Sequence, residues 1–341
     1  MSSRLVSWAR SPRSCSCRLA TAPPRASSWC SSRISCCASP TADWWGRLWV
    51  ADHWPISALG DEIAPGLEEQ IAVLHDQGVG ALELRSAWGI NVVDLGSERL
   101  ELAARLLRAA GMSVSAVGSP VGKADIEGDF DAELSRLRAA MDAAQRLQTR
   151  RIRVFSFFIP NGRHAAFRDE VLRRMSAFAK EAASQDLLLV HENESYVYGD
   201  DAVHCRDLVE SVGSPALQIA FDPANFVQVG VRPFDEAWPL LAQHVVHFHV
   251  KDAVRVDRDG VEPYPAHAPE ERLMASVRPA GEGEGQLADL LHALERQDYR
   301  GFLVIEPHLQ MRLHEIDATE RFAVALSALR GLVGETVASP H

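Results

Sequence analysis

The sequence predicts a (β/α)8 barrel, and three observations support this fold. From residue 56 onwards, short apolar runs alternate with longer amphipathic stretches, a pattern typical of βα units around a parallel sheet. Eight such units over ~280 residues match the usual size of a closed barrel. A doubly wound sheet would carry a Gly-rich phosphate turn after its first strand, and residues 59–66 contain none.

The first four units each consist of a short apolar run and a stretch long enough for a helix. The runs expected as strands are 56–62, 81–85, 112–117 and 151–156. The stretches expected as helices are 65–77, 97–110, 131–146 and 165–184.

The last four units follow the same pattern, with one long insertion. The expected strands are 187–192, 217–222, 245–250 and 301–306, and the expected helices are 201–212, 234–243, 286–297 and 314–332. Residues 253–283 are too many for an ordinary connection between a strand and a helix. Because this segment follows the seventh strand, we expect it to cover part of the catalytic mouth.

Residues 1–55 differ from the rest and are expected to be an irregular extension outside the domain, which spans 56–335. They carry seven Arg, no Lys and two Asp, whereas the remaining residues have a net charge of −16. A transit peptide, a cysteine metal cluster and a misassigned start remain open. The prolines argue against the first and the cysteine spacing against the second, so the third is favoured.

Net charge and cysteine content indicate which partners and which compartment to expect. A net charge of −11 disfavours nucleic acid or an anionic membrane surface as the main partner. The N-terminal segment has no apolar run long enough for a signal peptide core or a transmembrane helix. Cys205 is the single cysteine after residue 55, so we expect a cytoplasmic protein without a disulfide framework. Whether copies form a homo-oligomer stays open.

Metal-binding side chains stand at the ends of four successive predicted strands. They are Glu192, Asp222, His249 and Glu306. In a barrel these strand ends converge on one mouth, and a charge beside a buried strand is costly unless it is paired or coordinated. Taken singly, each has an ordinary explanation: a surface acid, an Asp-Pro turn, a core histidine, or an ion pair to Arg153 or Lys251.

Three carboxylates and one imidazole suit a hard divalent ion. We expect Mn²⁺, with Mg²⁺, Co²⁺ or Zn²⁺ as alternatives. Such an ion polarises a carbonyl group and stabilises an enediolate, while a neighbouring carboxylate removes and returns the proton.

Residues 56–332 resemble the xylose-isomerase-like barrel superfamily, in particular its sugar-phosphate isomerase/epimerase group with inosose dehydratases and ketose 3-epimerases. The motifs that carry the resemblance are Glu83-Leu-Arg85, Ser119-Pro-Val-Gly-Lys123, Ile152-Arg-Val-Phe-Ser156, His191-Glu-Asn-Glu194, Phe221-Asp-Pro-Ala-Asn225, His247-Phe-His-Val-Lys-Asp252, Gly281-Glu-Gly-Glu-Gly285 and Glu306-Pro-His308. The resemblance implies that Glu192, Asp222, His249 and Glu306 bind the metal. It also implies that Glu192 and Glu306 are the acid/base pair.

Further polar residues near the strand ends are expected to contact the substrate. They are Glu83, Lys123, Arg153, His247 and Lys251. The basic ones suit a phosphate or a carboxylate, but ion pairs with the metal-binding carboxylates are an equal alternative.

The expected function is a metal-dependent isomerase or epimerase of a small sugar, polyol or sugar phosphate. A dehydratase of an inosose-like keto-polyol is the alternative, because the same ligands serve both reactions. A DNA-repair endonuclease would need more histidines and a basic face. A binding protein with a decayed metal site is disfavoured by the complete ligand set.

Overall fold

The computed structural model describes residues 54–160, 162–256 and 270–338. Within them, eight parallel strands form one sheet in the order β1-β12-β9-β8-β7-β6-β5-β2. These strands are β1 (Ile56–Ala58), β2 (Ala81–Leu84), β5 (Ser113–Val117), β6 (Arg151–Val154), β7 (Leu188–Glu192), β8 (Leu217–Phe221), β9 (Val245–Val250) and β12 (Leu303–Ile305). A bridge between Leu59 and Glu83 joins the first unit to the second, so the ring closes. The predicted (β/α)8 barrel is confirmed.

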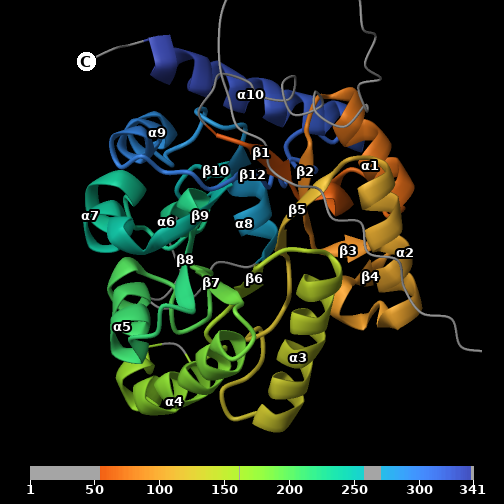
Figure 1. Ribbon diagram of the computed structural model, residues 1–341. Helices are drawn as coiled ribbons and strands as arrows, with labels where there is room; N and C mark the ends of the chain where they lie inside the picture. Colours follow the sequence, from red (N-terminus) through yellow and green to blue (C-terminus); the bar gives the residue numbers. More distant parts are fainter. Residues whose placement is uncertain (1–53, 161, 257–269, 339–341) are drawn as a thin grey trace, which may run out of the picture. The chain divides into compact units, whose positions relative to one another are not determined.

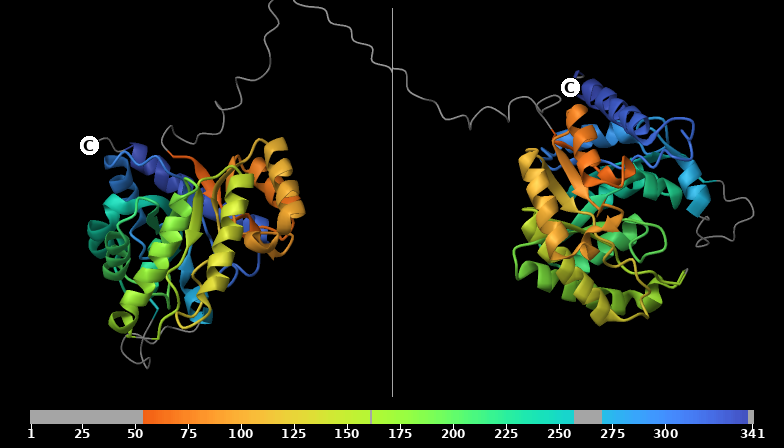
Figure 2. Two further views of the ribbon diagram at one scale, coloured as in Figure 1. Left: turned by 60° about the horizontal axis from the view of Figure 1, so that its bottom comes forward. Right: turned by 90° about the vertical axis from the view of Figure 1, so that its right-hand side faces the viewer.

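The long helices surround this ring (Figure 1). They are α1 (Leu67–Asp76), α2 (Gly96–Ala109), α3 (Phe130–Arg146), α4 (His164–Ala183), α5 (Ala202–Val212), α9 (Leu287–Arg296) and α10 (Ala318–Ala338). Their apolar residues recur every three to four positions, which gives each helix one face for the sheet. The last helix lies beside the first unit (Figure 2). There Arg330 donates to the backbone oxygen of Gln77 at 2.7 Å. None of the helices in the described ranges is long and apolar enough to cross a membrane.

Three connections differ from the sequence-based expectation. A hairpin of β3 (Ser86–Ala87) and β4 (Ile90–Asn91) precedes the turn η2 (Val92–Asp94), and the turn η1 (Gly60–Glu62) follows β1. The helix expected over 234–243 is divided into η3 (Pro233–Ala237), α7 (Trp238–Leu241) and η4 (Ala242–His244), and α6 (Pro223–Gln228) precedes them. Pro239, within the expected helix, lacks the backbone N–H that a continuous helix requires.

The long insertion after β9 contains regular structure that the sequence did not reveal. β10 (Asp252–Ala253) pairs antiparallel with β11 (Val277–Arg278), and α8 (Glu270–Ser276) precedes β11. Gly281, Gly283 and Gly285 donate their backbone N–H groups to the Asp252 carboxylate. This glycine-rich turn is therefore fastened to one buried side chain. Residues 257–269 of the expected cover lie outside the described residues.

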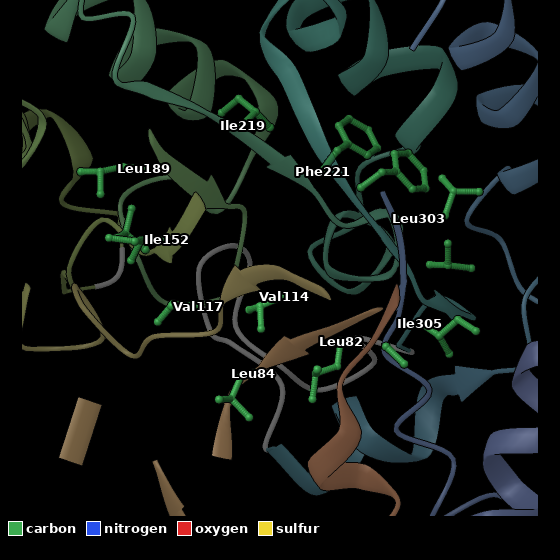
Figure 3. Close-up of a cluster of buried hydrophobic side chains, with 14 of the residues drawn as sticks. Leu82, Leu84, Val114, Val117, Ile152, Leu189, Ile219, Phe221, Leu303 and Ile305 are labelled. Carbon is green, nitrogen blue, oxygen red and sulfur yellow. The ribbon is translucent and has the colours of Figure 1, made fainter. Parts of the chain in front are cut away.

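Alternation along the strands separates an apolar outer face from a polar interior. Outward side chains such as Leu82, Leu189, Ile219 and Leu303 pack in the core between sheet and helices (Figure 3). Because successive side chains of a strand point to opposite faces, the residues next to them point into the barrel. The inward positions near the ends of β2, β6, β7, β8, β9 and β12 hold the charged residues of the candidate site.

We expect a chain that starts at Trp54 to fold without residues 1–53. Trp54 is 3% exposed, and its indole N–H donates to the backbone oxygen of Tyr299 at 3.0 Å. The truncated chain should therefore keep the wild-type Tm, whereas Trp54→Ala within it should lose about 3–5 kcal/mol of stability, as for other buried aromatic truncations. Thermal unfolding measures both. Insoluble truncated protein would show that residues 1–53 belong to the domain.

Candidate metal centre

The four predicted ligands come together at the carboxyl ends of their strands. Glu192 ends β7, Asp222 follows β8, His249 lies in β9 and Glu306 follows β12. One ligand atom from each lies within 4.8 Å of all the others, and each residue is at most 4% exposed. The Nδ1 atom of His249 is central: it lies 3.0 Å from Glu306 Oε2, 3.4 Å from Glu192 Oε1 and 4.0 Å from Asp222 Oδ2.

Local backbone structure places these side chains. Asp222 caps α6 by accepting from the backbone N–H of Asn225 at 2.9 Å, which leaves its second oxygen facing the cluster. The side chain of Asn193 pairs with the backbone N–H and C=O of Asp222, at 2.9 Å each. The ends of β7 and β8 are therefore tied together, and the Glu192 and Asp222 carboxylates are held next to each other.

Burial and mutual repulsion shape the charges of the cluster. Burial raises the pKa of Asp222, and although Lys251 lowers it, the nearby Glu192 and Glu306 bring it to about 6. Burial also opposes ionisation of Glu192, but His249 and Arg153 outweigh it and lower the pKa of Glu192 to about 2. For Glu306, Lys251 and the surrounding histidines outweigh burial, so its pKa falls well below the usual range. The raised pKa of Asp222 therefore reflects carboxylates crowded together at one buried place.

The donor set fits a divalent cation. Glu306 Oε2 and His249 Nδ1 lie 3.0 Å apart, yet neither has a hydrogen-bond partner of normal geometry among the described residues. Glu192 Oε2 also lacks a hydrogen-bond partner of normal geometry, but it lies 3.3 Å from Arg153 Nε. Buried polar atoms are normally paired, so the Glu306 and His249 atoms fit a cation bound beside them. Three carboxylates and one imidazole suit Mn²⁺, Mg²⁺ or Zn²⁺.

Glu83 lies beneath the cluster and orients two histidines. It is fully buried in β2, and its Oε2 atom is 2.8 Å from His247 Nε2 and 3.2 Å from His249 Nε2. Bonding to Nε2 of His249 leaves Nδ1 as the atom that faces the three carboxylates. This is the arrangement in which an outer carboxylate fixes the ring of a metal-binding histidine. The predicted contact of Glu83 with substrate stays a prediction, and the structure adds two imidazole partners.

The predicted basic contacts divide into two groups. Lys251 is buried, with Nζ 3.0 Å from Asp222 Oδ2, and Arg153 is buried between Glu192 and Glu83, at 3.3 and 3.5 Å. Both side chains therefore form ion pairs with carboxylates, which was the alternative to a substrate contact. Lys123 lies apart from the cluster, where its half-exposed side chain pairs with Glu194 at 3.0 Å and covers the Phe155 ring.

His191 shares a motif with Glu192 but not its environment. In β7 it points to the opposite face from Glu192, and its Nε2 atom is 2.9 Å from Ser156 Oγ. Burial lowers the pKa of His191 to about 4, so its ring is neutral.

A pocket of about 310 Å³ opens beside Glu306. Arg85 NH1 lies 3.3 Å and His308 Nε2 3.0 Å from Glu306 Oε1, and both residues line the pocket. Glu62 and Asp61, which follow β1, line it too and hold His308 and Arg85. Burial disfavours a charged His308, but Glu62 and Glu306 raise its pKa to about 9.

Arg85 and His308 belong to motifs of the resemblance but had no predicted role, and Asp61 and Glu62 were not predicted as site residues. The signal was available, because these acids and Arg85 directly follow the first and second strands. Applying the strand-end argument to all eight strands would have found them.

We expect Glu83→Gln to weaken metal binding roughly 10–100-fold, the usual cost of losing an outer partner of a metal ligand. Glutamine has the shape of glutamate, and its amide oxygen can still accept from both rings, but it has no negative charge to hold them and would turn an NH₂ group towards Arg153. Calorimetric Mn²⁺ titration measures the loss. The matched control is Glu194→Gln, which removes a carboxylate that pairs with Lys123 outside the cluster. Equal affinity of Glu83→Gln and wild type would show that Glu83 does not position the ligand.

Comparison with known proteins was made for sequence and structure. The family model described as xylose isomerase-like TIM barrel matches residues 71–329. No curated protein matches the chain.

Several solved structures share the fold. A xylose isomerase domain protein from Planctomyces limnophilus is 21% identical, with a TM-score of 0.62 over 85% of this chain and 100% of that one. A probable 3-DHS dehydratase, AsbF, from Bacillus anthracis is 16% identical, with a TM-score of 0.61 over 81% and 98%. The IolI protein, solved with a zinc atom, is 12% identical, with a TM-score of 0.66 over 83% and 99%. The resemblance predicted from the motifs is confirmed, and this chain belongs to the xylose isomerase-like TIM barrel family.

Proposed function

We propose that this protein is a divalent-metal-dependent isomerase or epimerase of a small sugar, polyol or sugar phosphate. The observation that carries the proposal is the convergence of Glu192, Asp222, His249 and Glu306 around one point at the carboxyl ends of the strands. These four residues would hold the ion, which we expect to be Mn²⁺. The zinc atom in the related IolI structure makes Zn²⁺ the first alternative to test.

The chemistry divides between the ion and the side chains. When bound, the ion supplies positive charge that polarises a carbonyl oxygen of the substrate. Glu306 offers two different oxygens: Oε2 faces the cluster, and Oε1 faces Arg85 and His308 on the pocket side. One carboxylate can therefore bind the metal and also take a proton from the carbon next to the carbonyl. Glu192, on the neighbouring side of His249, is the second proton carrier of the proposal.

The pocket of about 310 Å³ adjoins the cluster, but none of the four ligands is among its lining residues. In this proposal it takes the part of a compact substrate that lies away from the ion. His308 and Arg85 place hydrogen-bond donors at the same edge of the pocket as Glu306. Of the five contacts predicted from the sequence, Lys123 is the one with a half-exposed side chain, so a substrate phosphate would most readily meet Lys123.

A dehydratase is the second candidate. The probable 3-DHS dehydratase among the structural relatives has the same fold, and the same proton-transfer groups would begin removal of water next to a carbonyl. The two reactions differ in their products, not in their ligands.

Metal analysis of the purified protein, followed by an NMR screen in D₂O, tests the proposal. Ketoses, inososes and their phosphates should be incubated with wild type and with Asp222→Asn as the metal-poor control. The expected result is metal-dependent entry of deuterium into carbon, with a new epimer or isomer as product. An unsaturated product would identify the dehydratase. Protein that binds no divalent ion would overturn both candidates.

A further inference from the structure

A second group of metal-ligating side chains lies outside the centre described above. His164 is the first residue of α4, Asp200 precedes α5, and His204 lies in the first turn of α5. One ligand atom from each lies within 4.8 Å of the others. None of these residues takes part in the proposed reaction.

Two distances between donor atoms of this group are close to those between the ligands of one metal ion. Asp200 Oδ1 lies 3.0 Å from His164 Nε2 and 4.0 Å from His204 Nδ1. A tetrahedral site with bonds of ~2.1 Å has donor atoms ~3.4 Å apart, so the two distances bracket the required value. The two imidazole rings are stacked, with centroids 3.8 Å apart and planes 20° from parallel. Because an imidazole binds metal in the plane of its ring, one ring has to turn before both nitrogens face one ion.

The surroundings favour a positive charge at this place. Asp201 accepts from both the backbone N–H and the ring of His204, at 2.8 and 2.9 Å, and so fixes the ring. The Nδ1 atom of His204 lies 2.9 Å from Asp201 Oδ1 and 4.0 Å from Asp200 Oδ1, between two carboxylates that can hold a cation.

The group is held rigidly against the barrel. The backbone N–H of Gly199, next to Asp200, donates to Ser156 Oγ at 2.7 Å. A Cβ atom at Gly199 would lie 2.3 Å from the His191 ring, so the loop packs directly on β7. Asp200 is 2% and His164 8% exposed, whereas the His204 side chain is 26% exposed. Two ligands are thus fixed in the interior, and the third leaves a route from solvent.

We propose that His164, Asp200 and His204 form a second metal site that binds zinc. Two imidazoles and one carboxylate are a common zinc donor set, and the open side at His204 leaves the fourth position to Asp201 or water. The ion would join the N-terminal ends of α4 and α5, next to the loop that carries Glu194. Because an ion that binds only the folded state stabilises it, zinc should raise the Tm.

Zinc equivalents per chain test this proposal. The full-length protein is stripped with chelator, its thiols are blocked with iodoacetamide because five cysteines lie within residues 1–40, and it is dialysed against zinc. His164→Gln and His204→Gln should each bind one equivalent fewer than wild type. The zinc-induced rise in Tm should also be smaller in both variants. Because the count is a difference between variants, it does not depend on the metal centre of the proposed function.

The matched control is Arg168→Gln. Arg168 pairs with Asp207 across α4 and α5, at 2.6 and 2.9 Å, so its loss weakens the same contact but removes no ligand. This variant should bind as much zinc as wild type. Wild-type zinc content in both histidine variants would overturn the proposal and leave the group as a network of ion pairs. A loss of one equivalent in Arg168→Gln as well would overturn it too, since the effect would then follow helix contact and not ligation.

Discussion

Glu306→Gln is expected to abolish measurable turnover, with kcat lower by up to about 10⁴-fold, the upper end of a general acid–base contribution. Glutamine keeps an oxygen that can accept from Arg85 and His308, so the side chain should stay in place. Its amide cannot take a proton at pH 7. The other three ligands should retain part of the metal, so turnover should fall much more than metal content.

Glu62→Gln is the control for this variant. Glu62 also binds His308 and lines the pocket, but it is not among the four residues of the cluster. It should lower kcat far less than Glu306→Gln. Steady-state kinetics and metal content are measured on both variants. Full activity of Glu306→Gln with metal bound would mean that the centre exists but Glu306 is not its base.

Asp222→Asn should produce the largest loss of metal affinity. A neutral amide replaces a charged ligand, and we expect a loss exceeding the roughly 10–100-fold that follows removal of an outer partner. The fold should survive, because asparagine caps a helix as well as aspartate does, and the bond to the backbone N–H of Asn225 can persist. Lys251 would lose its closest carboxylate, which lies 3.0 Å away in the wild type.

Calorimetric titration with Mn²⁺ and thermal unfolding separate these effects. The control is Asp235→Asn on the surface, where the carboxylate pairs with Arg232. It should change neither affinity nor Tm. If Asp222→Asn binds Mn²⁺ as tightly as wild type, the ion does not lie between Glu192, Asp222, His249 and Glu306.

Hydrophobic periodicity was enough to place the barrel strands. Each of the eight expected strands overlaps an observed one, because a strand buried on both faces needs an apolar run whatever its neighbours are. The irregular connections were harder to predict. Residues 234–243 have helical composition, but they contain Pro239 and form short helical pieces. In the insertion after β9, the contacts of Asp252 with three glycine N–H groups decide the local structure, and such contacts leave no periodic signal.

The candidate site was also predictable in part. The strand-end argument selected Glu192, Asp222, His249 and Glu306, and the structure brings them together. The strand-end argument could not say which other residues each of these side chains contacts. His191 and Glu192 are adjacent in the sequence, yet alternation along β7 sends one to the helices and the other into the barrel.

The sequence by itself determined the fold and the chemical type of the four converging side chains, because both follow from local pattern and strand order. Only the tertiary structure decided which groups meet. Glu83 and His249 are separated by 166 positions, and barrel closure alone puts them 3.2 Å apart. His164 and His204 stack because two helices begin side by side. Contacts of this kind depend on how distant segments pack. A hydrogen bond forms or fails over tenths of an ångström, and the spacing of residues along the sequence does not fix distances between segments to that precision.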